Sequence, residues 1–113
     1  MAQYKHLPIY KETYELLKLI TERTKNYPRN FKYSLGDKIR NECVELVVFI
    51  FKANSTSGKE RKDHIFQILE RTQVIELLLR LSRDMNLLSI KHFAQILEKT
   101  DSILKQATGW SKS

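Results

Sequence analysis

Apolar residues recur at spacings of three and four along almost the whole chain, which is the pattern of amphipathic helices. This periodicity predicts four helices, over about residues 8–26, 35–53, 59–85 and 89–108. Only three Gly and two Pro are present, too few for the many turns of an all-β fold. The 113 residues suffice for one modest core. We therefore predict an all-α chain with a single domain, residues 1–113, folded as an antiparallel four-helix bundle.

Local residues indicate where these helices begin and end. Pro8 suits a first helical turn, because its missing N–H would be unpaired there in any residue. Pro28 stops the first helix, since a residue before proline avoids the α conformation. Ser34 is the expected N-cap of the second helix, with Asp37 in a capping-box position. Gly109 is expected to end the fourth helix.

The second and third helices carry more apolar residues than one bundle core requires. The run 46–51 would suit a buried strand equally well, but helical spacing extends upstream of it and favours a helix. Residues off the main core stripes include Val44, Val48, Phe51, Phe66, Val74, Leu77 and Leu81. Large apolar patches are usually covered by another subunit, so we predict self-association.

No residue pattern typical of a catalytic or metal site occurs in the sequence. His6, His64 and His92 are scattered, and neither a zinc-ligand spacing nor a glycine-rich phosphate loop is present. Cys43, the only cysteine, belongs to an apolar helix face, where an inert buried thiol is expected. We therefore predict a protein that is not an enzyme, with no cofactor and no metal.

The net charge of +7 and the pI near 9.6 favour an anionic partner. The longest uninterrupted apolar stretch, residues 46–51, is far too short to span a bilayer. The opening residues, MAQYKHLPIYKE, contain no apolar signal segment. We expect a cytoplasmic protein without a membrane partner, so RNA or DNA is the favoured anion.

One group of cations surrounds the predicted connection between the first two helices. It comprises Arg23, Lys25, Arg29 and Lys32, with Tyr27, Phe31 and Tyr33 interleaved. Bases stack on aromatic rings while cations hold phosphates, so this mixture suits single-stranded nucleic acid. In the alternative interpretation the aromatic side chains pin the connection to the bundle. From this group we select Arg29 and Lys32 as candidate binding residues.

A second group of cations lies on the third helix and at the start of the fourth. Its members are Arg71, Arg80, Arg83 and Lys91, which we place first among the candidate nucleic-acid- or partner-binding residues. Ser89 is a suitable N-cap for the fourth helix. The free N–H groups and positive dipole end there would favour a phosphate near Lys91.

Three of these arginines have alternative interpretations. Arg80 has Glu76 and Asp84 at four-residue spacing, so it could form ordinary surface ion pairs. Arg71 lies among apolar neighbours and would suit a subunit contact. Arg83 has no acidic residue at helical spacing.

Several phrases of the sequence, in order, are those of a known family. They are LPIYKETYELL (7–17), NYPRNFKYSLGDKIRNECVEL (26–46), LLLRLSRDMNLLSIKHFAQI (77–96) and the late pair Gly109-Trp110. Together they cover nearly the whole chain. The sequence resembles the accessory variability determinant (Avd) proteins of diversity-generating retroelements.

The resemblance implies a fold, partners and a function. Such proteins are four-helix bundles that form a basic pentameric barrel and bind both the retroelement's reverse transcriptase and nucleic acid. The complex copies a template-repeat RNA into mutated cDNA, and the accessory protein has no known catalytic residues. Five copies at +7 each would total +35, a strong field for RNA or DNA.

A related group offers the alternative function. Small four-helix bundle proteins encoded in intervening sequences of 23S rRNA genes act as structural or protein-interaction oligomers without a reverse transcriptase. Their second helix typically carries a Ser-Ile-Pro-Ser-Asn-Ile-Ala-Glu-Gly-like run. Here residues 44–51 read VELVVFIF instead, which favours the retroelement group.

Overall fold

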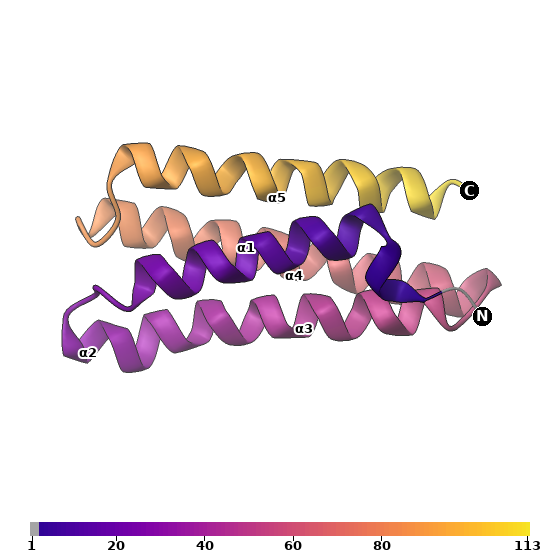
Figure 1. Cartoon of the computed structure of the whole chain (residues 1–113), viewed down its shortest axis with the longest axis horizontal. Coiled ribbons are helices and arrows are strands. Elements are labelled where there is room, and N and C mark those ends of the chain that lie inside the picture. Colours follow the sequence, from indigo (N-terminus) through magenta and orange to yellow (C-terminus); the bar gives the residue numbers. More distant parts are fainter. Residues whose placement is uncertain (1–2) are drawn as a thin grey trace.

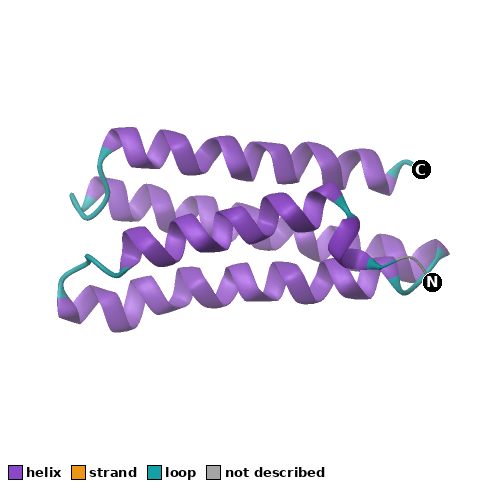
Figure 2. Ribbon diagram, viewed as in Figure 1, coloured by secondary structure: helices purple, strands orange, loops and turns teal. Residues whose placement is uncertain are grey.

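The computed structural model describes residues 3–113 as helices joined by short connections (Figures 1 and 2). Four long helices alternate in direction: α1 (Pro8–Thr24), α3 (Asp37–Asn54), α4 (Gly58–Asp84) and α5 (Ile90–Ser111). A single 3-10 turn, η1 (Tyr4–His6), precedes α1. A short α-helix, α2 (Arg29–Phe31), and a π-helical segment, η2 (Lys32–Gly36), lead into α3. The predicted all-α architecture with four helices is confirmed.

The helices form an elongated bundle with two distinct ends. Both α1 and α4 pack against α3 and α5, and the molecule measures 43 × 22 × 21 Å. One end, called the turn end below, carries the connections 25–28 and 85–89 (Figure 1). The opposite end, called the terminal end, carries the connection 55–57, the N-terminal segment and the last turns of α5.

The core follows the helical spacing read from the sequence. In α4 the buried residues alternate at three and four positions: Ile65, Ile68, Thr72, Ile75, Leu79 and Ser82. The corresponding residues of α5 are Phe93, Ile96, Thr100, Ile103 and Ala107. This spacing keeps one face of each helix against its neighbours, as in other antiparallel bundles.

Three threonine hydroxyls within this core are satisfied locally. The side chains of Thr13, Thr24 and Thr72 donate to backbone carbonyls four residues earlier, at 2.7–2.8 Å. Each bond leaves the threonine methyl group to pack in the core. These three buried positions therefore cost little stability, because each hydroxyl has a partner.

The second helix begins earlier than predicted. The backbone turns helical directly after Pro28 and stays helical through α2 and η2 into α3. Ser34 is not an N-cap, because it lies inside this run and donates to the Asn30 carbonyl at 2.6 Å. Gly36 is buried, and a Cβ atom there would meet Thr24 and Arg40 side-chain atoms at 3.4 Å.

The predicted end of the fourth helix is also wrong. Gly109 lies within α5, which continues to Ser111. Glycine adopts the helical conformation as readily as the left-handed one, so its presence alone does not end a helix. The left-handed glycine is Gly58, with φ of +59°, at the first position of α4.

Several of the surplus apolar residues are exposed on the surface. The outer face of α4 presents Phe66, Leu77 and Leu81, and Leu77 is 64% exposed. On α3, Val44 and Phe51 are also exposed, although Phe51 packs edge-on against Tyr4 of η1. The α4 face is unpartnered within residues 3–113.

Candidate nucleic-acid interface

The turn end brings together two groups of cations that are far apart in the sequence. Because the helices alternate in direction, the connections 25–28 and 85–89 lie at the same end (Figure 1). Five of the six predicted binding residues lie there: Arg29, Lys32, Arg80, Arg83 and Lys91. With Arg23 and Lys25, residues 21–37 and 80–92 hold seven Lys and Arg against three acids, a formal net charge of +4.

The first group lies where the chain leaves α1 and enters the helical run before α3. Lys25 and Arg29 are exposed, while Lys32 is half-buried. The Lys32 Nζ atom lies 5.6 Å from the centre of the Tyr33 ring, within the range of a cation–π contact. Neither Lys25 nor Arg29 forms an ion pair within residues 3–113.

Of the interleaved aromatic residues, one anchors the connection to the bundle and another is exposed for base stacking. Tyr27 is only 4% exposed and anchors the connection, as the alternative interpretation expects. Burial raises the pKa of the Tyr27 hydroxyl, and the nearby Ser82 hydroxyl opposes part of that rise. Tyr33, in contrast, is 63% exposed beside the cations. Tyr33 is therefore available to stack with a base.

The second group lies at the end of α4. Arg80 is exposed and forms no ion pair within the described residues, so the alternative interpretation, pairing with Glu76 and Asp84, is not found. Asp84 instead pairs with its neighbour Arg83, at 2.9 Å. Both guanidinium groups lie over the Phe93 ring, 6.0 Å away for Arg80 and 4.7 Å for Arg83. Phe93 thereby fixes both side chains at the turn end.

The start of α5 adds a shallow depression to this surface. A cavity of about 500 Å³ is lined by Arg83, Asp84 and residues 86–90. Ser89 is the N-cap, as predicted, and its Oγ atom accepts from the His92 backbone N–H at 3.1 Å. Lys91, in the first turn, is exposed. The positive end of the α5 dipole and the adjoining cations would favour an anion in this depression.

Arg71 lies apart from the other five predicted residues. It is in the middle of α4, and its guanidinium donates to Glu42 of α3. Glu42 is buried, so its carboxylate has this arginine as its charged partner. Arg71 is thus engaged within the bundle.

The described residues show no arrangement suited to metal binding, and the thiol of Cys43 is buried. Within residues 3–113 there is no group of three or more His, Cys, Asp or Glu side chains that could hold a metal ion. Cys43 is fully buried, and burial, together with the Glu42 carboxylate, raises the pKa of its thiol to about 12. No helix in this part of the chain is long and apolar enough to cross a membrane.

Two comparisons with known proteins bear on the chain. A family model described as bAvd-like matches residues 7–113, which is nearly the whole chain. No curated protein matches the sequence. The family match agrees with the resemblance in the sequence phrases at 7–17, 26–46 and 77–96.

Proposed function

Since this chain belongs to the bAvd-like family, we propose that it is a non-catalytic accessory protein of a diversity-generating retroelement. In this role it forms a basic homo-oligomer in the cytoplasm and binds the reverse transcriptase together with RNA or DNA. It thereby supports mutagenic cDNA synthesis from the template-repeat RNA. The number of subunits in this oligomer, five, is what the resemblance to the Avd family implies.

The observation that carries the nucleic-acid part is the cation cluster at the turn end. Arg29, Arg80 and Lys91 are exposed and have no carboxylate partner within residues 3–113. Cations that already pair with carboxylates have less to gain from a phosphate, so these three are the most effective contacts. Arg71 is left out of the proposed interface, because its guanidinium is held by Glu42.

Single strands are the preferred form of the ligand. The exposed Tyr33 ring stands beside Lys32 and close in sequence to Arg29. A base can stack on such a ring only when it is not enclosed in a duplex. The proposed interface therefore combines phosphate contacts with one stacking platform.

The oligomer is supported by the outer face of α4. Phe66, Leu77 and Leu81 are exposed along one side of a helix whose opposite face fills the core, in a row that the exposed Glu70 and Gln73 interrupt. Exposed apolar area of this kind is usually covered by another surface, because burying it removes it from water. The same row also favours the second candidate function, a structural oligomer of the 23S rRNA intervening-sequence type that meets a protein partner through apolar contacts.

Salt separates these two functions. Phosphate binding releases counterions and weakens steeply as salt rises, whereas an apolar interface changes little. We propose to measure the affinity for a labelled single-stranded RNA by fluorescence anisotropy between 50 and 200 mM salt, the range in which such binding falls most visibly. A salt-independent affinity, or none, would favour the structural oligomer.

A matched pair of variants locates the interface. Arg29→Gln/Arg80→Gln/Lys91→Gln removes three charges from the turn end, and Lys11→Gln/Lys18→Gln/Lys105→Gln removes three from the middle of the bundle. The turn-end variant should lower the slope of log affinity against log salt by about 2, since each phosphate contact to a single strand contributes about 0.7. Equal losses in both variants would mean that only net charge matters.

The reverse-transcriptase part needs its own experiment. A tagged copy of the chain, expressed with the reverse transcriptase of a diversity-generating retroelement, should retain the enzyme on purification. Synthesis of cDNA from the template-repeat RNA should require the chain. A reverse transcriptase that neither co-purifies nor needs the chain would contradict this part.

A further inference from the structure

The terminal end is as cationic as the turn end. Residues 3–9, 52–63 and 106–113 hold six Lys and Arg against two acids, a formal net charge of +4. Four of these cations are exposed and form no ion pair within the described residues: Lys5, Lys52, Lys62 and Lys112. The other two are engaged, because Lys59 pairs with Asp63 and Arg61 donates to the Ala53 carbonyl.

A nearly neutral middle section separates the two cationic ends. Residues 10–20, 38–51, 64–79 and 93–105 hold eight of the thirteen acids against seven cations, a formal net charge of −1. Within residues 3–113, four of its exposed carboxylates form no ion pair (Glu45, Glu70, Glu98 and Asp101), and the same holds for three exposed lysines (Lys11, Lys38 and Lys105). The positive charge is therefore concentrated in two separate patches, one at each end of the 43 Å bundle.

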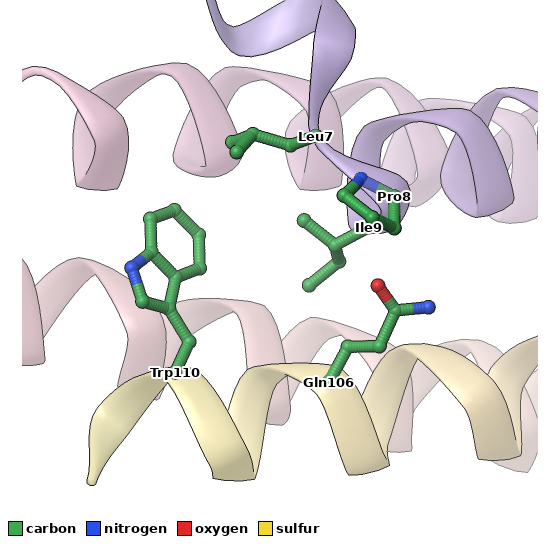
Figure 3. Close-up of a pocket in the computed structure, with 5 residues that line it drawn as sticks. All are labelled: Leu7, Pro8, Ile9, Gln106 and Trp110. Carbon is green, nitrogen blue, oxygen red and sulfur yellow. The ribbon is translucent and has the colours of Figure 1, made fainter. Parts of the chain in front are cut away.

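A cavity lies within the cationic terminal end. It has a volume of about 300 Å³ and opens between the start of α1 and the last turns of α5 (Figure 3). Leu7, Pro8 and Ile9 line one side, while Gln106 and Trp110 rise from α5 on the other.

The walls of this cavity offer both apolar area and polar recognition. Trp110 is partly exposed, and the Arg61 guanidinium of α4 lies 5.8 Å from its ring centre. The Gln106 amide nitrogen donates to Ser102, which leaves the carbonyl oxygen free to accept from a ligand. The volume is at the lower end of the range for small-ligand sites, which suits a single planar ring system.

We propose that this cavity receives an unpaired base of a single-stranded nucleic acid. Trp110 supplies the stacking surface, Gln106 an acceptor for an exocyclic amino group, and the exposed lysines hold the flanking phosphates. An apolar slot at an end of the bundle that also carries four unpaired lysines matches a nucleotide, which presents a flat ring next to an anion. The inference rests on the proposed nucleic-acid function and adds a second site. One chain can then hold two separate segments of nucleic acid, one at each end.

Trp110 is the only tryptophan, so its fluorescence reports on this end alone. The full chain is titrated with an unlabelled single-stranded RNA and with a duplex of the same sequence, and anisotropy of a labelled copy is followed in parallel. The single strand should quench Trp110, while the duplex should leave its fluorescence unchanged. Equal quenching by the single strand and the duplex would overturn the proposal that the cavity receives an unpaired base.

Two variants separate the terminal site from the turn end. Lys5→Gln/Lys62→Gln/Lys112→Gln should abolish the quenching but keep binding measured by anisotropy. The turn-end variant, Arg29→Gln/Arg80→Gln/Lys91→Gln, should keep the quenching. All six side chains are exposed, so both variants should fold. Quenching that survives in the first variant and disappears in the second would overturn the assignment.

Substitution of the ring itself gives an independent measure. In the background of the turn-end variant, where binding at the turn end is weakened, Trp110→Leu should weaken the single-strand affinity of the terminal site by about fivefold to 150-fold, the range for one stacked base. Trp110→Phe should lose less affinity for the single strand, because phenylalanine keeps an aromatic face.

The two proposals fail differently. RNA that binds by anisotropy, depends on the turn-end cations and leaves Trp110 unchanged would overturn the second site and keep the proposed function. Absence of binding by either readout would overturn both.

Discussion

The Arg71 guanidinium donates to both carboxylate oxygens of Glu42, at 3.0 and 3.2 Å, and so joins α4 to α3. Glu42 is only 3% exposed, whereas the Arg71 side chain is 36% exposed. A buried carboxylate is costly unless a cation stays beside it. The pair therefore fixes the contact between these two helices. Because its guanidinium is held by Glu42, Arg71 has a structural role in the bundle and is not free to bind a ligand.

Removing Arg71 should destabilise the protein by leaving Glu42 buried and unpaired. We expect Arg71→Met to lower the free energy of unfolding by about 2–3 kcal/mol, below the range for fully buried pairs because Arg71 is partly solvated. Chemical denaturation measures this loss. The double variant Glu42→Met/Arg71→Met should regain most of it. The control Arg80→Met, at an exposed unpaired arginine, should change stability by less than about 0.5 kcal/mol.

Cys43 should be unreactive in the folded protein and should make folding sensitive to alkaline pH. Its thiol pKa is raised from its ordinary value of 9.0 to about 12, first by burial and then by Glu42. Between these values the unfolded chain releases a proton that the folded chain keeps, so stability falls as pH rises.

Two measurements check the cysteine prediction. At pH 8 a thiol reagent should modify the native protein only as fast as the protein opens. Above pH 9, stability should fall more steeply in the wild type than in Cys43→Ala, by at most about 1.4 kcal/mol per pH unit. Modification at the rate of a free thiol would contradict the burial of Cys43.

Substitution by alanine should have opposite effects on stability at Gly109 and at Gly58. Gly109 lies inside α5 with open space around its Cβ position, so Gly109→Ala should stabilise the protein by about 0.5 kcal/mol. Gly58 also has open space, but its φ of +59° disfavours a side chain, so Gly58→Ala should cost about 1 kcal/mol. Thermal denaturation distinguishes the signs. A destabilising Gly109→Ala would indicate that the helix does end at Gly109.

The α4 surface predicts a variant that dissociates the oligomer without unfolding the chain. Leu77 is exposed, so Leu77→Glu should change the free energy of unfolding by less than about 0.5 kcal/mol. The added charge should nevertheless lower the mass measured by light scattering toward 13.4 kDa. Gln95→Glu adds the same charge to exposed α5 surface and should leave the mass unchanged. A lower mass of the assembly in both variants would mean that the α4 row is not the subunit interface.

The fold could be predicted largely because helical spacing is a local property. The positions of Ile65, Ile68 and Thr72 on one face follow from their spacing alone. The start of the second helix could not be found in this way, because Ser34 suits an N-cap but lies within a continuous helical run. Cap preferences are statistical, and here the backbone after Pro28 had already become helical.

The site could be predicted only in part, because its residues meet through tertiary structure. Arg29 and Arg83 belong to separate segments of the sequence, and the alternating helix directions bring both to the turn end. Arg71 resembles them in sequence, but its partner Glu42 is 29 residues away and gives no local signal. The cations of the terminal end, such as Lys5 and Lys112, are spread over three segments, so no local pattern in the sequence indicates that they share one end.

We propose that an oligomer of this chain binds nucleic acid through its cationic surface. Light scattering tests this by measuring the mass of the assembly, with and without a structured RNA, across a salt series. We predict a mass several times 13.4 kDa, five times if the family's barrel forms, which gains RNA at low salt and releases it at high salt. A 13.4 kDa monomer that binds no RNA at any salt concentration would contradict both the oligomer and the nucleic-acid interface.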